Sequence, residues 1–312
     1  MRLLPLDEIR PVLEYSEIIG RMRAALIAYS RGECETPMPM HLEIPAQDAE
    51  VHIKSSYRRG GRYFALKIAG TFPRNAGRGL PAGAGMMLLS SAESGEPVAF
   101  LADEGHLTDV RTAAAAAMTA RELGRTDRTI GILGTGIQAR LSARLHAEAL
   151  DADAIVIWGR SGERVAECAR DLGEQLPRVR IETAASPADV AAACRLIVTC
   201  TAAREPLLRR QDLLPGTHIS AIGADSPGKQ ELEAAILRHA ALVLADSRRQ
   251  CEKLGELQHA PDLWGRAVEI GEYCQGARAV AAEGITVCDF TGLGVEDLYI
   301  AEYVYEKLKE RT

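Results

Sequence analysis

Residues 131–141 read GILGTGIQARL and join an apolar run to a helical pattern through a glycine-rich turn. Gly134 and Gly136 have the spacing of the dinucleotide-binding fingerprint G-x-G-x-x-G/A, whose third position here is an alanine. The first glycine permits a tight turn and the second lets a pyrophosphate approach the backbone, where N–H groups and the helix dipole attract its charge. We therefore predict that Gly134, Gly136, Ile137 and Gln138 bind a dinucleotide. A plain strand-to-helix turn is the alternative interpretation.

The end of the next apolar run indicates which dinucleotide is preferred. An acid about 20 residues beyond the first glycine usually accepts hydrogen bonds from the ribose 2′-hydroxyl of NAD. Here the run ends in Arg160 and Ser161 with no acid, and these side chains suit a 2′-phosphate. The expected cofactor is NAD(H) or NADP(H), with a preference for NADP(H). A solvated loop cation at Arg160 is the alternative.

The chain beyond the turn alternates between apolar runs and helical patterns, which predicts a doubly wound parallel sheet of the Rossmann type. The runs are apolar throughout, as expected when helices cover both faces of a sheet. The predicted helices of this part span residues 137–150, 162–175, 187–193 and 230–238.

The residues before the turn have a different hydrophobic pattern. Helical spacing predicts an opening helix over 7–31, although Pro11 must lie near its start. Short apolar or alternating runs over 38–101, separated by Gly, Pro and Asn, predict an antiparallel sheet. An alanine-rich helix follows over 108–124, capped by Thr108, and a last strand, a glycine turn and a long amphipathic helix end the chain. The fold class is therefore α/β, a Rossmann unit beside a discontinuous α+β part.

Composition narrows the function to a small-molecule partner. The 312 residues carry a net charge of −6 with both signs interspersed, so no basic tract predicts nucleic acid or a membrane surface. No signal peptide or membrane span is expected, and the scattered cysteines, without C-x-x-C spacing, are typical of a cytoplasmic protein. The seven histidines have no metal-ligand spacing, so no metal is expected.

Two lysines stand in predicted strands. In RYFALKIAG, residues 62–70, strand alternation places Lys67 in the middle of an apolar run. A buried lysine is rare without a partner, so Lys67 is predicted to bind a substrate carboxylate or transfer a proton; an internal ion pair is the alternative. Lys54 belongs to another strand and is predicted to point the same way, unless it is an exposed edge-strand lysine.

Arg111 is expected in the first turn of the alanine-rich helix, where a cation does not stabilise the helix dipole but can bind a docked anion. With the helix N–H groups it could hold a substrate carboxylate in a forked arrangement. A salt bridge from Arg111 to Asp109 or Glu104 is an equally simple interpretation.

Asp225 follows a predicted strand at the carboxyl edge of the parallel sheet, where such folds bind ligands. We predict that it is the acid/base group beside the nicotinamide; an Asx turn is the alternative. Thr199 and Thr201 end another strand at this edge, and Thr291 lies in the turn before the last helix. All three are candidates for nicotinamide contacts, although threonine is common at strand ends.

Six stretches together resemble the ornithine cyclodeaminase and mu-crystallin family, which includes alanine dehydrogenases, ketimine reductases and ectoine-utilisation members. The resemblance implies a Rossmann domain, residues 128–295, inserted in a substrate-binding and dimerisation domain, residues 1–127 and 296–312, and a homodimer formed through the latter. It also implies that Lys67 and Arg111 hold the substrate carboxylate and that Asp225 is the acid/base. The stretches are LKIAGTFPRN, GEPVAFLADEGHLTDVRTAAAAAMTA, GILGTGIQA, HISAIGADSPGKQEL, LGELQHA and ITVCDFTGLGVEDLYIA.

The resemblance implies an enzyme that oxidises, deaminates and cyclises an amino acid such as L-ornithine to proline with NAD(P). Two departures matter. The cyclodeaminases have an arginine near the stretch PMPMHLEI, where this chain has Met38, Met40 and His41. They also have an acid thirteen residues before the lysine, where this chain has Lys54, as in the ectoine-utilisation branch. A lysine cannot receive the distal ammonium of ornithine. The alternatives are an NADPH-dependent ketimine or pyrroline-2-carboxylate reductase or amino-acid dehydrogenase, and an NADP(H)-binding protein like mu-crystallin with little turnover.

Overall fold

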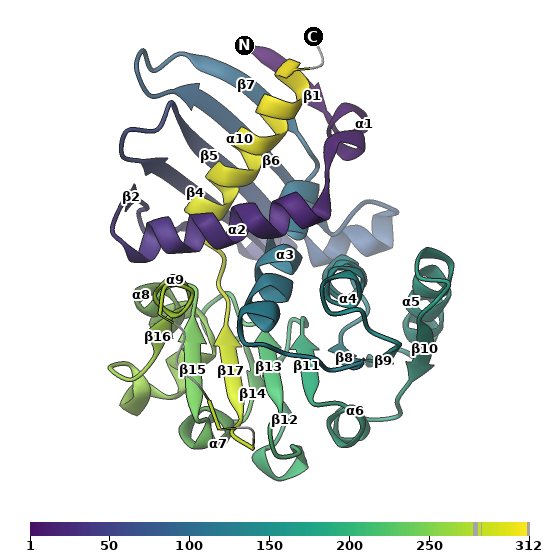
Figure 1. Ribbon diagram of the computed structural model, residues 1–312. Coiled ribbons are helices and arrows are strands. Elements are labelled where there is room, and N and C mark those ends of the chain that lie inside the picture. Colours follow the sequence, from purple (N-terminus) through teal and green to yellow (C-terminus); the bar gives the residue numbers. More distant parts are fainter. Residues whose placement is uncertain (277–279, 282, 311–312) are drawn as a thin grey trace. The chain divides into compact units, whose positions relative to one another are not determined.

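The chain folds into two compact units in a computed structural model that describes residues 1–276, 280–281 and 283–310 (Figure 1). One unit contains residues 1–111 and 293–312, and the other contains residues 112–292. Across the described ranges, no helix is long and apolar enough to cross a membrane. The assignment of residues 1–127 and 296–312 to substrate binding and dimerisation stays a prediction.

The second unit is built on a parallel sheet, and this confirms the predicted doubly wound α/β class. The strands are β8 (Thr129–Leu133), β9 (Ala154–Trp158), β10 (Arg180–Thr183), β11 (Leu196–Thr199), β13 (His218–Ala221), β15 (Leu242–Ala245), β16 (Val268–Glu269) and β17 (Thr286–Asp289). Their order across the sheet is β10-β9-β8-β11-β13-β17-β15-β16. The six inner strands are buried almost throughout, as expected for a sheet covered on both faces, whereas the edge strands β10 and β16 are partly exposed.

Three predicted helices of this unit form with the predicted bounds, and the fourth does not. The helices are α4 (Ile137–Leu150), α5 (Gly162–Gln175), α6 (Pro187–Ala193), α7 (Ala234–His239), α8 (Arg248–Leu254) and α9 (Ile270–Tyr273). The prediction of a helix over 230–238 was wrong at its start, because β14 (Gln230–Leu232) pairs with β12 (Arg204–Leu208). The Gln230 N–H donates to the Ala203 carbonyl at 2.9 Å, which holds these residues extended.

The first unit contains the predicted antiparallel sheet, extended by two strands outside the predicted range, one at each edge. β1 (Arg2–Pro5) pairs parallel with β7 (Pro97–Ala102) at the edge. The sheet continues through β6 (Gly83–Ser91), β5 (Tyr63–Thr71), β4 (Ala49–Arg58) and β2 (Cys34–Glu35), and β3 (Met40–Ile44) also pairs with β4. From β3 to β7 the pairs are antiparallel.

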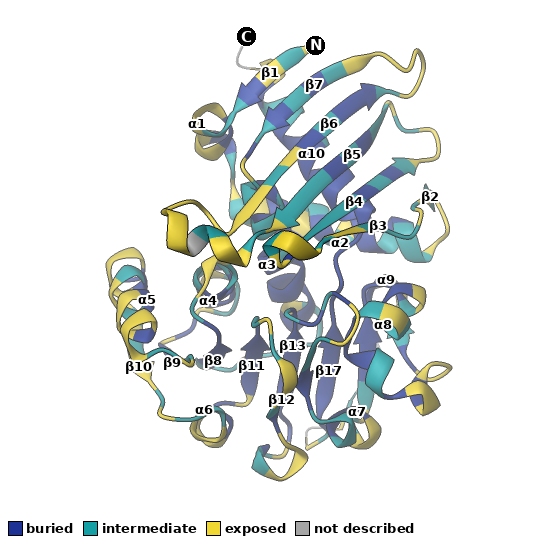
Figure 2. Cartoon of the chain, turned by 180° about the vertical axis from the view of Figure 1, so that it is seen from behind, coloured by how far each residue is buried: buried dark blue, intermediate teal, exposed yellow. Residues whose placement is uncertain are grey.

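The two faces of this sheet differ in what covers them. α2 (Tyr15–Ser30) and α10 (Gly294–Glu310) lie over one face, and α10 packs against α2, β4 and β5 (Figure 1). Figure 2 views the sheet from the other side, where strand alternation leaves Leu66, Ile68, Leu88 and Phe100 only partly buried. This second face is therefore an apolar surface, here called the apolar sheet face.

The predicted opening helix over 7–31 is interrupted. Its residues form α1 (Leu6–Ile9), a 3₁₀ turn at Arg10–Val12 and then α2. Pro11 has no N–H to continue a helix, and Leu13 takes an extended conformation with ψ of 108°. The long periodicity was therefore two helical segments separated by a proline-directed break.

The alanine-rich helix α3 (His106–Glu122) begins two residues earlier than predicted. The Asp103 carboxylate accepts the Leu107 N–H at 2.9 Å, so Asp103 caps the first turn in place of Thr108. Arg111 consequently lies in the second turn, not the first, and the prediction that it borders the helix N–H groups was wrong. The boundary between the two units falls directly after Arg111.

We predict that a methyl group at Gly294 disrupts the seating of α10 on β4. An added Cβ would lie 2.4 Å from the Ser55 carbonyl oxygen, and backbone on both sides leaves it no room to move. Gly294→Ala should lower the free energy of unfolding by about 2 kcal/mol in urea denaturation. Gly20→Ala is the matched control, because a Cβ at that exposed α2 position meets nothing within 4 Å. It should raise stability by up to about 1 kcal/mol, and equal losses in both variants would contradict the prediction.

Candidate functional site

Lys67 and Lys54 lie side by side on the face of the sheet covered by α10. They are direct partners in the β4–β5 register, so their side chains leave the same face. Lys67 is 2% exposed and Lys54 8%. The interpretation of Lys54 as an exposed edge-strand lysine is therefore wrong, because β2 and β3 pair with the outer side of β4.

Two acids at the start of α10 accompany these lysines and Arg111. Lys67 Nζ lies 3.4 Å from Asp297 Oδ2, and the Arg111 Nε–H donates to Asp297 Oδ1 at 3.0 Å. Arg111 Nη1 donates to Glu296 Oε2 at 3.1 Å, and the same oxygen accepts the Leu293 N–H at 2.7 Å. All four side chains are at most 3% exposed. The set is called the ion cluster below and consists of Lys54, Lys67, Arg111, Glu296 and Asp297.

Glu296 and Asp297 were not among the site residues predicted from the sequence. The salt bridges of Arg111 to these two acids join residues about 185 positions apart, whereas the sequence offered only the local partners Asp109 and Glu104. Two acids in the first turn of a helix are ordinarily explained by the helix dipole, so the motif gave no sign of burial. The burial of both acids follows from the packing of α10 on the sheet.

Burial and mutual charge set the ionisation of the ion cluster. Burial lowers the pKa of Lys67 from 10.5 to about 7; Asp297 partly opposes this shift, and Lys54 and Arg111 reinforce it. Burial acts to raise the pKa of Asp297, but Arg111, Lys67 and Lys54 hold it below its ordinary value. With Lys67 protonated, three cations face two carboxylates, and the Lys67 amine can exchange a proton near neutral pH.

The glycine turn in the second unit has the shape that a dinucleotide pyrophosphate needs. Gly134 has φ of +138°, and an added Cβ there would meet Cys200 Sγ at 2.7 Å, so only glycine fits. A Cβ at Gly136 would have no atom within 4 Å, which leaves open space above the backbone at the start of α4. Ile137 follows and is 59% exposed, although it is a large aliphatic residue. These features fit a bound dinucleotide.

The two residues predicted to bind the ribose 2′-position, Arg160 and Ser161, have different surroundings. Arg160 is exposed just beyond β9. Ser161 caps α5, and its hydroxyl oxygen accepts the Arg164 N–H at 3.4 Å. The exposed Arg160 side chain is therefore the stronger candidate for a phosphate contact.

Two of the three threonines predicted to contact the nicotinamide donate hydrogen bonds to buried acids. The Thr201 N–H and hydroxyl both donate to Glu231 Oε1, at 2.6 and 2.7 Å. The Thr291 N–H and hydroxyl donate to Asp246, at 2.7 and 3.0 Å. Thr199 is fully buried at the end of β11. Sequence reasoning missed both acids, which fix the loops at the carboxyl edge of the sheet.

Asp225 lies four residues beyond the end of β13, at the predicted edge of the sheet. Its Oδ1 accepts hydrogen bonds from Lys229 Nζ at 2.7 Å and from the Ser226 hydroxyl at 3.1 Å. The Asp225 side chain is 43% exposed, whereas that of Lys229 is 13% exposed. The carboxylate is thus oriented by a partly buried cation and remains accessible.

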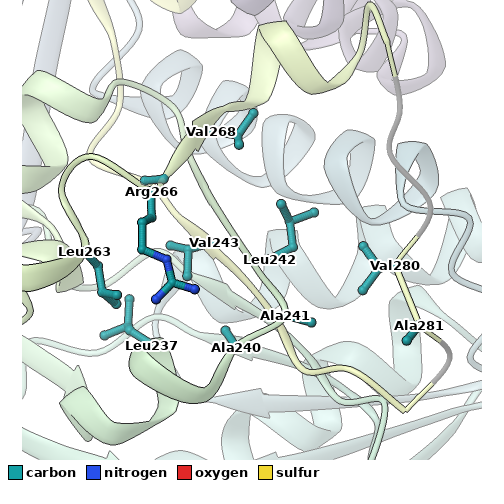
Figure 3. Close-up of a pocket in the computed structure, with 11 residues that line it drawn as sticks. Leu237, Ala240, Ala241, Leu242, Val243, Leu263, Arg266, Val268, Val280 and Ala281 are labelled. Carbon is teal, nitrogen blue, oxygen red and sulfur yellow. The ribbon is translucent and has the colours of Figure 1, made fainter.

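The pocket shown in Figure 3 lies away from the glycine turn. It has a volume of about 270 Å³ and surrounds the beginning of β15, at the amino edge of the parallel sheet. Aliphatic side chains such as Leu237, Leu242 and Val268 line it together with Arg266 (Figure 3). Since dinucleotides bind at the carboxyl edge of such sheets, this pocket is distinct from the predicted cofactor site.

Comparison with known proteins gives a match over nearly the whole chain. The model of the ornithine cyclodeaminase/mu-crystallin family matches residues 3–312. A putative dehydrogenase of Rhizobium meliloti is 34% identical, covering 98% of this chain and 95% of that protein. The alanine dehydrogenase of Archaeoglobus fulgidus is 30% identical, covering 97% and 94%. A Delta(1)-pyrroline-2-carboxylate reductase of Bacillus cereus is 29% identical, covering 100% and 98%.

Solved structures agree with this match. An archaeal alanine dehydrogenase dimer with bound NAD superposes with a TM-score of 0.90 at 26% identity, covering 100% of this chain and 97% of that one. A lysine cyclodeaminase that recognises L-lysine, L-ornithine and L-2,4-diaminobutyric acid gives 0.90 at 28% identity, covering 100% and 93%. The Thermococcus litoralis Delta(1)-pyrroline-2-carboxylate reductase, at 24% identity and a TM-score of 0.93 over 100% and 98%, shares the fold.

We predict that Lys67 makes stability depend on pH in the alkaline range. Its folded-state pKa of about 7 lies below the ordinary 10.5, so between these values the folded protein binds fewer protons than the unfolded chain. The free energy of unfolding of the native protein, minus that of Lys67→Met, should therefore rise as pH increases from about 7 to about 9.5. Below about 7 the difference should be constant.

The measurement is urea unfolding of both proteins across this pH range. Lys253→Met is the control, because Lys253 is exposed on α8. A difference that stays flat for Lys67→Met, as for the control, would show that the Lys67 ammonium is not strained by burial.

Proposed function

Because the chain belongs to the ornithine cyclodeaminase/mu-crystallin family, we propose that it is a nicotinamide-dependent oxidoreductase that interconverts a 2-imino acid and the corresponding amino acid. The observation that carries this proposal is the buried ion cluster with Lys54 in it. Family members among its relatives reduce imines, dehydrogenate amino acids or cyclodeaminate diamino acids. The charge of the cluster favours the first two activities.

The ion cluster supplies a binding site for the α-carboxylate of the substrate. When Lys67 is protonated, Lys54, Lys67 and Arg111 exceed Glu296 and Asp297 by one positive charge, and a carboxylate would compensate it in a water-poor setting. Glu296 and Asp297 fix the Arg111 guanidinium in place before substrate arrives. Such preorganisation holds the α-carbon in one orientation, which is the condition for stereospecific hydride transfer.

The glycine turn supports nicotinamide dinucleotide as the cofactor. Gly134, Gly136, Ile137 and Gln138 would hold the pyrophosphate, and the bound nicotinamide would donate or accept the hydride. The archaeal alanine dehydrogenase contains bound NAD and the iminosuccinate reductase of Paracoccus denitrificans is a complex with NAD+, which fits this assignment at the level of NAD(P). The preference for NADP(H) rests on the exposed Arg160.

Asp225 is our candidate for proton transfer to and from the substrate nitrogen. An accessible carboxylate oriented by Lys229 and Ser226 suits a base that removes a proton from an ammonium. Lys67 is a second candidate, because its pKa of about 7 lets it hold or release a proton near neutral pH. Thr199, Thr201 and Thr291 remain predicted nicotinamide contacts, and for Thr201 and Thr291 the bonds to acids fix the backbone that would provide them.

Cyclodeamination of L-ornithine is the second candidate function. The 28% identity to a lysine cyclodeaminase over the whole chain favours it. A second ammonium must then be accommodated by the substrate site, and Lys54 would repel it if the distal end of the substrate extends along β4. For this reason we place an imine reductase or amino-acid dehydrogenase first.

The apolar sheet face fits a homodimer interface. Leu66, Ile68, Leu88 and Phe100 present partly buried aliphatic and aromatic surface, and Met86 is 40% exposed. Surface of this kind is typical of contacts between copies of a chain. One related alanine dehydrogenase is described as a dimer. Light scattering of the protein in solution should give the mass of two chains, and a monomer mass would contradict this assignment.

The proposed reaction predicts a specific pattern of products. The purified protein should oxidise NADH or NADPH in the presence of a cyclic 2-imine such as Δ1-pyrroline-2-carboxylate, or of a 2-oxo acid with ammonia, and form one amino acid per cofactor oxidised. L-ornithine with the oxidised cofactor should yield neither proline nor ammonia. Equal proline and ammonia without net cofactor reduction would replace our proposal with the second candidate. Cofactor binding without turnover on any of these substrates would indicate a mu-crystallin-like binding protein.

Two variants sharpen this assay. Asp225→Asn should abolish turnover while dinucleotide binding persists, since the amide cannot take up a proton. Lys54→Glu should raise KM for the imine about tenfold or more, with Lys54→Met as the matched control for loss of charge alone. A fully active Asp225→Asn protein would remove Asp225 from the mechanism.

If Arg160 binds the 2′-phosphate, its loss should change the preference for NADPH over NADH. Arg160→Ala should weaken NADPH binding by about tenfold or more and NADH binding by less than twofold, because only NADPH carries the 2′-phosphate. Fluorescence titration with both cofactors measures the ratio. Arg164→Ala is the control, since Arg164 is exposed one turn further along α5. Equal losses for both cofactors in Arg160→Ala would contradict the 2′-phosphate assignment.

A further inference from the structure

Two histidines and a glutamate converge on the β3–β4 pair. His41 and His52 are direct cross-strand partners, and their ring centroids lie 4.8 Å apart at an angle of 73°. Glu50 precedes His52 by two residues and therefore leaves β4 on the same face. One ligand atom from each of the three side chains lies within 4.8 Å of the others. The cluster is on the sheet of the first unit and involves no residue proposed above to act on substrate.

One ring nitrogen of each histidine makes no hydrogen bond to the described residues. His41 Nδ1 and His52 Nε2 are buried and make no hydrogen bond to any described residue. Leaving a buried polar atom without a hydrogen bond is energetically unfavourable. The His41 and His52 side chains are only 29% and 13% exposed, so bulk water reaches them poorly. A lone pair in this position is a ready ligand for a cation.

We propose that His41, Glu50 and His52 bind a divalent cation of the Zn²⁺ class. Two imidazoles and one carboxylate form a set that zinc accepts, with a further position open for water or an anion. Ligand atoms about 2.0–2.1 Å from a tetrahedral zinc lie about 3.3 Å from one another. His52 Nε2 and Glu50 Oε2 are 3.8 Å apart, so small rotations of the side chains suffice. Mg²⁺ and Ca²⁺ prefer oxygen ligands throughout and suit this set less well.

Glu43 supports the orientation that zinc requires. Its Oε1 lies 3.7 Å from His41 Nε2, the nitrogen opposite the unpartnered Nδ1. Histidine ligands usually direct their second ring nitrogen at a carboxylate, which fixes the tautomer and presents the other lone pair to the metal. The arrangement at His41 matches this pattern with Nδ1 as the ligand atom.

A cation here would act on both the strand pair and the neighbouring charges. It would join β3, which pairs only with β4 within the described sheet, to the body of the first unit. His52 is two residues from Lys54 on the same face of β4, so a bound cation would add positive charge beside the ion cluster. An open coordination position on that face would suit an anionic group of a ligand.

The test is metal binding by the untagged full-length protein without nicotinamide or substrate. After chelator treatment, calorimetric titration with Zn²⁺ should give one site per chain with Kd below about 10 µM, and Co²⁺ should give visible absorption bands of a tetrahedral site. His41→Ala and His52→Ala should each weaken binding by about 100-fold or more, and Glu50→Gln by about tenfold. His239→Ala, a change at an exposed histidine of α7, should bind like the native protein.

Two results would overturn the proposal. One is native protein that binds no stoichiometric Zn²⁺. The other is a His41→Ala/His52→Ala protein, folded by circular dichroism, that binds as much as the native protein, which would place the metal elsewhere, for example on the cysteines. Since no turnover is measured, failure of the proposed oxidoreductase activity leaves this test unaffected.

Discussion

The pairing of Arg111 and Lys67 with Glu296 and Asp297 is the constraint on which the first unit depends. Buried charges of one sign cost several kcal/mol each unless opposite charges meet them with good geometry. The last helix must therefore begin where its two acids reach α3 and β5, and the close approach of Gly294 to the backbone of β4 permits this. The packing of the C-terminal helix and the proposed carboxylate site thus depend on the same ion pairs.

Buried carboxylates have a different part in the second unit, where backbone N–H groups are their partners. Glu231 accepts from the loops after β11 and β13, Glu256 accepts the N–H of Glu231, and Asp289 accepts the N–H of Glu256. Asp246 holds the turn at Thr291 in the same way. Burial raises the pKa of Glu231 to about 6 and that of Asp289 to about 7. This series of hydrogen bonds fixes the carboxyl edge of the sheet, where the predicted cofactor contacts lie.

Family membership and the buried charges bear on different parts of the proposed function. The family and the glycine turn support nicotinamide chemistry on an amino or imino acid. In our proposal the cations on the sheet bind the carboxylate end of such a molecule, and Lys54 disfavours a second ammonium. The His41–His52 pair extends the same face of the sheet toward its β3 edge, where a cation would add to the positive charge.

The sequence by itself determined the Rossmann unit, because its signals are local. A strand, two glycines at fixed spacing and a helix follow one another directly, so the bounds of α4, α5 and α6 were predicted without error. It also placed Lys67 correctly in mid-strand, since alternation along one strand is a local property. The break at Pro11 was visible in the sequence but was underestimated, because helical spacing on both sides concealed it.

Only the tertiary structure decided which charges meet. Arg111 pairs with acids about 185 residues away. The strand registers place Lys54 beside Lys67 and His41 beside His52. The predicted start of the helix over 230–238 was wrong for the same reason, since the extended form of β14 at these residues depends on pairing with β12. Spacing along the chain reports contacts within a turn or a strand. Contacts between strands, or between a strand and a distant helix, depend on register and packing, which the local pattern does not specify.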